Sequence, residues 1–162
     1  MKRKLPRGAD VDPWVERLSY NVGQVVGDSR IEGVAFANGK LFVTGGAGGE
    51  GDSLNYIYVF DRDMTMVDQF PQPDPSGNYG ITDLDWDGEL IWGGFKDTLY
   101  GIDPTGVVAT SFKVDRAVAP IEAVAWDPDR QILWVAKITG RDIYGYNRLG
   151  QQVATIPQSG LS

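Results

Sequence analysis

The strongest constraint in this sequence is a seven-residue pattern that occurs three times. The copies begin at Ile31, Ile81 and Ile121, so their starts lie 50 and 40 residues apart. Large apolar residues occupy the first, fourth and sixth positions of each copy. Because apolar residues close to strict alternation are typical of half-buried strands, each copy predicts one strand. The chain is therefore expected to consist of three related units.

Each unit also carries signals for three further strands. Asn38-Gly39 and Asp87-Gly88 are strong hairpin signals because these residues tolerate positive φ, and Asp127-Pro128-Asp129 stands in the same place in the third unit. Each third strand ends in Asp or Asn, which opens an Asx-type turn. The second, third and fourth strands are expected at 40–43, 57–61 and 66–70, then at 90–92, 99–103 and 107–112, and finally at 132–135, 143–147 and 152–156.

Four short antiparallel strands in every 40 to 50 residues are the signature of a β-propeller blade. The sequence thus predicts an all-β chain with three blades, at about 28–78, 79–118 and 119–158. No segment keeps a 3.6-residue apolar period, so helices should be scarce. The aromatic residues that recur in register are expected in the core, and they are Phe36, Trp86, Trp92, Trp126 and Trp134.

The three units resemble the blades of NHL or YVTN-type β-propellers. The resemblance rests on the Trp-Asp ends of two first strands, the Leu-Trp-Val second strand at 133–135 and the Ile-Tyr third strands at 57–58 and 143–144. It implies the propeller fold and says little about function. True WD40 repeats pair their Trp-Asp with a Gly-His, and this chain has no histidine.

Residues 1–27 are expected to hold a tail together with either a partial blade or a short helix. The partial blade would place strands at 15–20 and 24–27, because Tyr20-Asn21 resembles Tyr146-Asn147 of the third unit. The alternative is a one-turn helix opened by Asp12-Pro13. We favour the strand interpretation because it extends the repeat.

Three blades are fewer than the four to eight that usually close a propeller ring. An arc of three leaves two outer faces, each exposing apolar surface on a scale that marks an interface. Two copies of the chain around a two-fold axis would complete a six-bladed ring, and this homodimer is the solution we favour. Alternatively, the missing blades belong to a longer protein, since 159–162 reads as the approach to another first strand.

Composition removes several classes of function. The 15 basic and 22 acidic residues give a net charge of −7, which disfavours nucleic acid as a partner. The absence of cysteine and histidine excludes disulfides, thiolate metal sites and Ser-His or Cys-His catalysis. The basic start at 1–7 is not followed by the apolar stretch of a signal peptide, and no run is long enough to span a membrane.

Candidate binding residues come from the loops and from the innermost strands. Propellers are expected to bind ligands on the face that carries the connections from strand four to one and from strand two to three. An acid at the start of each first strand would point toward the central channel, and Tyr79 is the best exposed contact residue. The candidates are Glu32, Asp83, Glu122, Tyr79, Lys96, Lys137 and Arg141.

No cofactor and no metal ligand set is predicted, although Glu50 and Asp52 in the Gly-rich loop at 45–53 are oxygen ligands of the kind that calcium prefers. Three function classes follow, in this order. The first is a non-catalytic binding or interaction module. The second is a cation-dependent hydrolase or lyase that uses channel carboxylates, and the third is a structural piece of a larger propeller.

Overall fold

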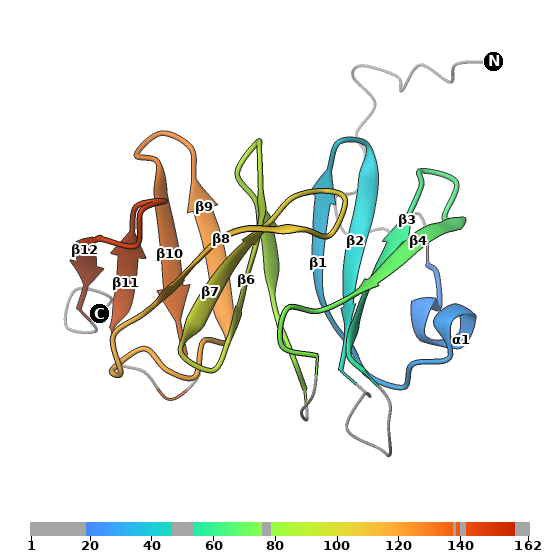
Figure 1. Ribbon diagram of the computed structural model, residues 1–162, viewed down its shortest axis with the longest axis horizontal. Helices are drawn as coiled ribbons and strands as arrows, with labels where there is room; N and C mark the ends of the chain where they lie inside the picture. The colour runs from blue at the N-terminus through green and yellow to red at the C-terminus, as the bar shows by residue number, and fades with distance from the viewer. Residues whose placement is uncertain (1–18, 47–53, 76–78, 138, 140–141, 158–162) are drawn as a thin grey trace, which may run out of the picture.

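The computed structural model describes residues 19–46, 54–75, 79–137, 139 and 142–157, and it contains three four-stranded antiparallel sheets (Figure 1). We call these sheets blades 1, 2 and 3. Blade 1 consists of β1 (Ile31–Ala37), β2 (Lys40–Gly45), β3 (Tyr56–Phe60) and β4 (Met66–Pro71). Blade 2 consists of β5 (Leu84–Trp86), β6 (Ile91–Phe95), β7 (Thr98–Ile102) and β8 (Val108–Lys113). Blade 3 consists of β9 (Ala123–Asp127), β10 (Ile132–Ala136), β11 (Ile143–Tyr146) and β12 (Gln152–Ile156).

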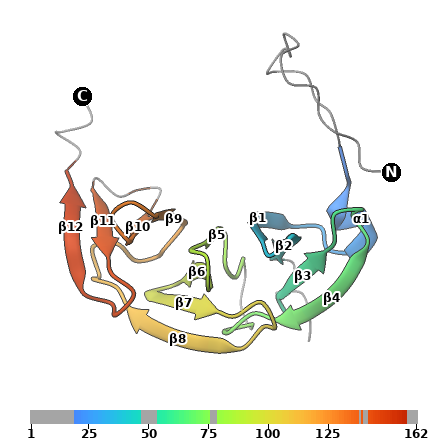
Figure 2. The same ribbon diagram turned by 90° about the horizontal axis from the view of Figure 1, so that it is seen from above.

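The blades stand side by side in an arc (Figure 2). The first strands β1, β5 and β9 lie on the inner side of the arc, and the fourth strands β4, β8 and β12 lie on the outer side. Within each sheet the strands follow one another in chain order. The predicted fold class, all-β with three blades of four antiparallel strands, is confirmed.

The predicted turns explain why the strands reverse where they do. Asn38 and Gly39 both have positive φ, 48° and 80°, as a two-residue hairpin turn requires. At the end of β7, the Asp103 carboxylate accepts backbone N–H bonds from Thr105 and Val107. Asp61 and Asn147 close the corresponding turns of the other two blades in the same way.

The expected fourth strand at 24–27 is wrong, because these residues belong to a helix and its cap. Helix α1 spans Val22–Val26. The Asn21 side chain accepts a bond from the Gln24 N–H, and Gly27 ends the helix with a φ of 71°. Apart from Ser19 and Tyr20, the strand expected at 15–20 and the helix expected at Asp12-Pro13 lie outside the described residues.

Two apolar cores lie between the blades. The core between blades 1 and 2 includes Phe42, Ile57 and Ile91, and the core between blades 2 and 3 includes Trp92 and Leu133. A smaller cluster joins α1 to Val43, Tyr58 and Phe60 of blade 1. The Asp28 carboxylate, which accepts bonds from the Tyr58 hydroxyl and the Arg30 N–H, ties the segment after α1 to the same sheet.

Equivalent residues of the three blades differ in burial, and the difference marks the open ends of the arc. We call the face of a blade toward the preceding blade its leading face. On this face Leu84 of blade 2 and Val124 of blade 3 are 4% and 5% exposed, but the equivalent Val34 is 56% exposed. Phe36, expected in the core, is likewise 53% exposed because no blade precedes blade 1 in the described chain.

The opposite face of each blade, its trailing face, shows the same effect at the other end. Phe42 of blade 1 and Trp92 of blade 2 are fully buried by the blade that follows. The equivalent Trp134 of blade 3 is only half-buried, and Trp86 and Trp126, which face a preceding blade, are also half-buried. The arc therefore ends in two partly apolar sheet faces.

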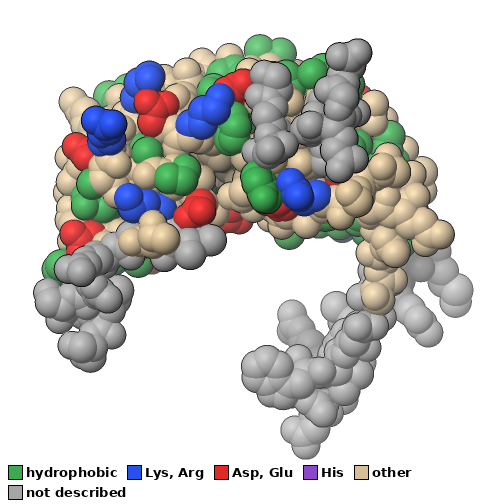
Figure 3. Space-filling model, turned by 90° about the horizontal axis from the view of Figure 1, so that it is seen from below, with side chains coloured by type: hydrophobic (Ala, Val, Ile, Leu, Met, Phe, Trp, Pro, Cys, Tyr) green, Lys and Arg blue, Asp and Glu red, His purple; other side chains and the backbone are tan. Residues whose placement is uncertain are grey.

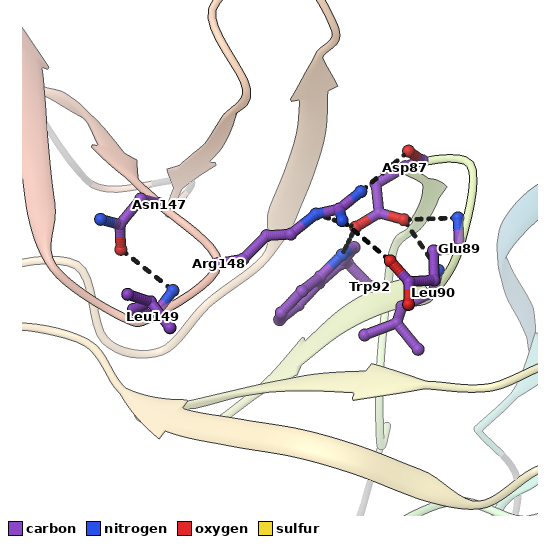
Figure 4. A network of polar contacts seen from close by, with 7 residues as sticks. All are labelled: Asp87, Glu89, Leu90, Trp92, Asn147, Arg148 and Leu149. Carbon is purple, nitrogen blue, oxygen red and sulfur yellow. Dashed lines mark hydrogen bonds and ion pairs between the residues drawn. The ribbon is translucent and has the colours of Figure 1, made fainter.

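A polar network and a close ring contact join neighbouring blades (Figure 4). Arg148, in the turn after β11, reaches the Asp87 and Glu89 carboxylates in the turn after β5, at 2.8 and 3.0 Å. Asp87 also accepts the Trp92 indole N–H at 2.6 Å. On the outer side, the Phe70 ring lies against Gly106, where an added Cβ would approach a ring carbon to 2.5 Å.

Candidate functional site

A half-enclosed hollow of about 450 Å³ lies among the loops that join the blades. These loops are at the bottom of the ribbon in Figure 1. Figure 3 views this face, where acidic, basic and hydrophobic side chains lie next to one another. Its walls come from the start of β1, the connections β4–β5 and β8–β9, and the turn between β6 and β7. We call it the basal hollow, and its lining residues are Glu32, Tyr79, Gly80, Thr82, Phe95, Lys96, Pro120, Ile121 and Glu122.

The buried side-chain amide of Gln72 positions the β4–β5 connection that carries Tyr79. Gln72 is 2% exposed, and its side-chain nitrogen donates to the carbonyls of Gly45 and Tyr56. Its side-chain oxygen accepts the Ile81 N–H at 2.7 Å. Gly80 fits against this amide with a φ of 63°, and an added Cβ would lie 2.3 Å from the Gln72 oxygen. The wall of the hollow is therefore fixed by hydrogen bonds from blade 1.

Tyr79 is held in an exposed and strained position. Its φ is 80°, in the left-handed region that a bulky residue rarely adopts, and 54% of the residue is exposed. The Arg30 guanidinium lies 4.1 Å from the centre of its ring. This contact keeps an aromatic ring at the rim of the hollow.

Lys96 lies in the β6–β7 turn at the opposite wall. Its ammonium forms an ion pair with Asp74 at 2.8 Å and lies 4.6 Å from the centre of the Phe95 ring. Its carbonyl accepts the Ile121 N–H, which joins this turn to the β8–β9 connection. The lysine charge is thus neutralised beside the hollow.

Two carboxylates from different blades line the hollow. Glu32 comes from β1, and Glu122 directly precedes β9. Burial raises the pKa of Glu32 above its usual value of 4.5, Arg30 at 3.9 Å acts in the opposite direction, and Asp28 raises it further. The Thr82 hydroxyl, between them in the repeat, donates to the Glu122 carbonyl.

The structure thus places four of the predicted candidates, Glu32, Tyr79, Lys96 and Glu122, around one hollow. Asp83 does not line it. Its carboxylate accepts backbone N–H bonds from Leu84 and from Val124 of blade 3, so it clasps two blades together. Burial is the main cause that raises the pKa of Asp83, and these two bonds oppose it.

The remaining candidates lie elsewhere. Lys137 directly follows β10, and its ammonium donates to the carbonyl of Ala119 in the β8–β9 connection at 3.4 Å. Arg141 lies outside the described residues, as do Glu50 and Asp52 of the Gly-rich loop.

The hollow also contains residues that were not among the candidates. Thr82 occupies the repeat position of Glu32 and Glu122, so aligning the three copies at their isoleucines identifies it. Phe95 and Ile121 supply apolar lining, and Arg30 supports Tyr79 from behind. Nothing in the sequence places these last three at one site, because their proximity depends on how the blades pack.

In 19–46, 54–75, 79–137, 139 and 142–157, no three acidic side chains gather closely enough to hold a metal ion. Helix α1 has five residues, so the described part of the chain contains no helix that could cross a membrane.

Comparison with solved structures supports the fold. The streptogramin B lyase structure is 16% identical, with a TM-score of 0.59, and the match covers 78% of this chain and 40% of that chain. The mitotic checkpoint complex structure is 16% identical, with a TM-score of 0.55, and the match covers 78% of this chain and 39% of that chain. The Neurospora crassa Pan2 WD40 domain is 12% identical, with a TM-score of 0.56, and the match covers 78% of this chain and 40% of that chain. No protein-family model and no curated protein matches the chain.

These likenesses and the three sheets together define the chain as an arc of β-propeller blades. It spans about 40% of the length of the solved structures that it matches. At identities of 12–16% the likeness establishes the fold and not an activity.

Proposed function

We propose that this chain is a non-catalytic binding module, and that its basal hollow receives a cationic group carried on an apolar stem. The single observation that carries the proposal is the convergence of Glu32 and Glu122, from blades 1 and 3, on one half-enclosed hollow with apolar lining. Such a hollow, with few polar groups at fixed places, is the usual form of a small-ligand site.

The charge of the hollow favours a cation over an anion. Two carboxylates and one lysine line the cavity. The lysine pairs with Asp74 at 2.8 Å, and the Glu32 carboxylate has a longer contact, 3.9 Å, with Arg30. The net charge of −7 on the whole chain adds long-range attraction for cationic ligands and partners. Phe95 and Ile121 would contact the apolar stem, and the exposed Tyr79 ring would contact the remainder of the ligand.

The blades are also proposed to be of the NHL or YVTN type, which their Trp-Asp and Ile-Tyr strands resemble. A chain of the mitotic checkpoint complex and a lyase both occur among the solved structures of this fold. A binding experiment on this chain must therefore be able to detect catalysis as well.

We expect 2-phenylethylamine to bind in the basal hollow and its neutral isostere 2-phenylethanol to bind far more weakly. Glu122→Gln should lower the amine affinity by about tenfold to a hundredfold, because a hydrogen bond to a charged group contributes about 1.5–3 kcal/mol. Titration followed by NMR chemical shifts would measure both affinities. The shifts should centre on residues 79–82, 95–96 and 120–122.

Asp68→Asn is the matched control, because Asp68 is an exposed carboxylate on β4 that does not line the hollow. It should leave the amine affinity unchanged. Equal binding of the amine and the alcohol, or shifts confined to other surfaces, would disprove the proposal. Chemical conversion of a ligand that stops on chelation would instead favour the cation-dependent hydrolase or lyase.

The affinity for the amine should depend on pH through Glu32. Its pKa is raised, so its negative charge is present above that pKa and is lost as the pH falls through it. The amine itself stays protonated, since its pKa is near that of lysine, about 10.4. Acidification from about pH 7 to about pH 5 should therefore weaken binding to the natural chain more than to the Glu32→Gln variant. Identical pH profiles would show that Glu32 does not contribute to binding.

A further inference from the structure

We infer that a second copy of this chain closes the arc into a six-bladed ring, and that Arg62 of one copy pairs with Asp127 and Asp129 of the other. The inference is independent of the proposed ligand. It rests on a junction inside the chain whose two halves occur again, unpartnered, at the two ends of the arc.

The internal template is the junction between blades 2 and 3 (Figure 4). Arg148, which follows Asn147 in the turn after β11, lies 5.0 Å from the centre of the Trp126 ring on the leading face of blade 3. From there it reaches Asp87 at 2.8 Å and Glu89 at 3.0 Å in the β5–β6 turn. An arginine of one blade thus binds the first hairpin turn of the blade before it.

Blade 1 carries the arginine half of this junction. Arg62 follows Asp61 in the turn after β3, as Arg148 follows Asn147. Its guanidinium lies 5.6 Å from the centre of the Phe36 ring, and Phe36 occupies the repeat position of Trp126. Arg62 is exposed and forms no ion pair with any residue that the structure describes.

Blade 3 carries the acidic half at the other end of the arc. Asp127 occupies the repeat position of Asp87, and it accepts the Trp134 indole N–H at 3.4 Å as Asp87 accepts that of Trp92. Asp129 is exposed at the position of Glu89. The present ion pair of Asp127 is with Arg130 of its own turn, whose side chain is 70% exposed.

Acid and base occur together at these junctions or not at all. The first hairpin of blade 1 has Ala37 at the Asp87 position, and blade 2, which follows it, has Pro104 at the Arg148 position. Blade 2 has the acids and blade 3 has the arginine. Blade 3 again has the acids, and a blade with an arginine at this position completes the pattern. Blades 1 and 3 both carry that arginine, and Arg148 of blade 3 already binds blade 2, which leaves Arg62 of blade 1.

Side-chain size matches in the same way on the outer side of the arc. Phe70 lies on Gly106 of the next blade, and Phe112 lies on Gly150, with no space for a Cβ at either glycine. The third turn of this kind has Met64, with a φ of 61°, and the third outer position has Ile156, which pairs with Ile143 as Phe70 pairs with Ile57. A smaller side chain thus meets a larger turn residue where blade 3 would meet blade 1.

Helix α1 packs on the leading face of blade 1, against Val43, Tyr58 and Phe60, whose counterparts Val135, Tyr144 and Tyr146 in blade 3 pack against blade 2. Val34 and Phe36, on the same face, stay more than half exposed. Closure of the ring therefore requires α1 to leave this position so that blade 3 of the second copy covers the face. Three blades from each of two copies give six, within the four to eight that close a ring. Both contacts are then identical by two-fold symmetry, as in most homodimers.

Native mass spectrometry and sedimentation over a concentration series would test the ring. The natural chain should have twice the mass of one chain. Arg62→Glu should raise the dissociation constant at least a hundredfold, because each dimer loses the ion pair at two junctions. Asp129→Arg should have a similar effect, and the two substitutions in one chain should restore the dimer to within threefold of the natural affinity.

Arg116→Glu is the matched control, since Arg116 is exposed in the β8–β9 connection and the substitution makes the same charge change. It should leave the dimer intact, and circular dichroism should show that all the variants fold. A natural chain that stays monomeric at every concentration would overturn the ring, and would fit a chain completed by further blades. A dimer that Arg62→Glu and Arg116→Glu weaken equally would overturn the assigned contact.

A disulfide experiment checks which faces meet, because the natural chain has no cysteine. Met64→Cys and Ile156→Cys chains are mixed and oxidised. A ring should give a disulfide that joins one Met64→Cys chain to one Ile156→Cys chain, since a disulfide needs Cβ atoms about 3.5–4.5 Å apart and the ring would make these two residues face each other. Only disulfides between identical variants would contradict the arrangement.

Discussion

Replacement of Asp87 by alanine should lower the free energy of unfolding by about 3–5 kcal/mol, because a buried donor left without its acceptor costs about 1–3 kcal/mol and the bonds that close the hairpin turn are lost as well. The Asp87 side chain is fully buried and accepts bonds from the Trp92 indole and two backbone N–H groups while pairing with Arg148. The alanine variant leaves the Trp92 indole N–H and two backbone N–H groups without their acceptor, whereas the Arg148 guanidinium keeps its bonds to the Glu89 carboxylate and the Asp87 carbonyl. Urea unfolding of the chain, followed by tryptophan fluorescence, would measure the loss.

Asp127→Ala is the control that the repeat itself provides. Asp127 also closes its hairpin turn and accepts a tryptophan indole, but no arginine of a following blade reaches it in the single chain. Its removal should cost only about 1–2 kcal/mol, the contribution of the turn bonds. Both variants should be compared in the Arg62→Glu background, so that self-association does not enter. Equal losses would mean that the Arg148 junction does not stabilise the arc.

Gly106→Ala should destabilise the chain by about 2–5 kcal/mol through two separate effects. The φ of 92° costs about 1–2 kcal/mol for a residue with a Cβ. The new Cβ would also lie 2.5 Å from the Phe70 ring, and such overpacking typically costs about 1–3 kcal/mol. The same unfolding measurement applies.

Gly88→Ala separates the two effects. Gly88 has a similar φ of 96°, but an added Cβ there would meet no atom within 4 Å. It should cost only the backbone contribution, about 1–2 kcal/mol. Phe70→Leu should reduce the penalty of Gly106→Ala when the two are combined, because the shorter side chain frees the space. Equal effects of Gly106→Ala and Gly88→Ala would show that Phe70 moves aside without cost.

The fold could be predicted from sequence because the information for each blade is local. Hairpin turns such as Asn38-Gly39 and Asx turns such as the one at 103–106 fix the strand ends within a few residues. The three copies then support one another, since an error in one unit shows as a mismatch with the next. Helix α1 lies outside the repeat, where the resemblance of Tyr20-Asn21 to another turn predicts a strand, and the helix start that the sequence suggests, Asp12-Pro13, is a different one.

The basal hollow could be predicted only in part. The acids Glu32 and Glu122 occupy the second position of their repeats and line the hollow. Asp83 occupies the third position of its repeat, and its carboxylate joins two blades instead. Its side chain bonds the backbone of blade 3, and a sequence pattern does not report the direction in which a side chain at the end of a strand points. Phe36 shows the same limitation for burial. An aromatic residue in register is buried only where another blade covers it.

The strand ladders in this protein each close within their own sheet, and the sheets meet only through side chains and loops. Duplication of one forty-residue unit would therefore add a complete sheet without disturbing the pairing of any existing strand. Loss of an inner strand, in contrast, would leave two edges without partners. Changes in the number of repeats during evolution should accordingly occur in whole units, with later adjustment at the glycine, phenylalanine, aspartate and arginine positions where sheets meet.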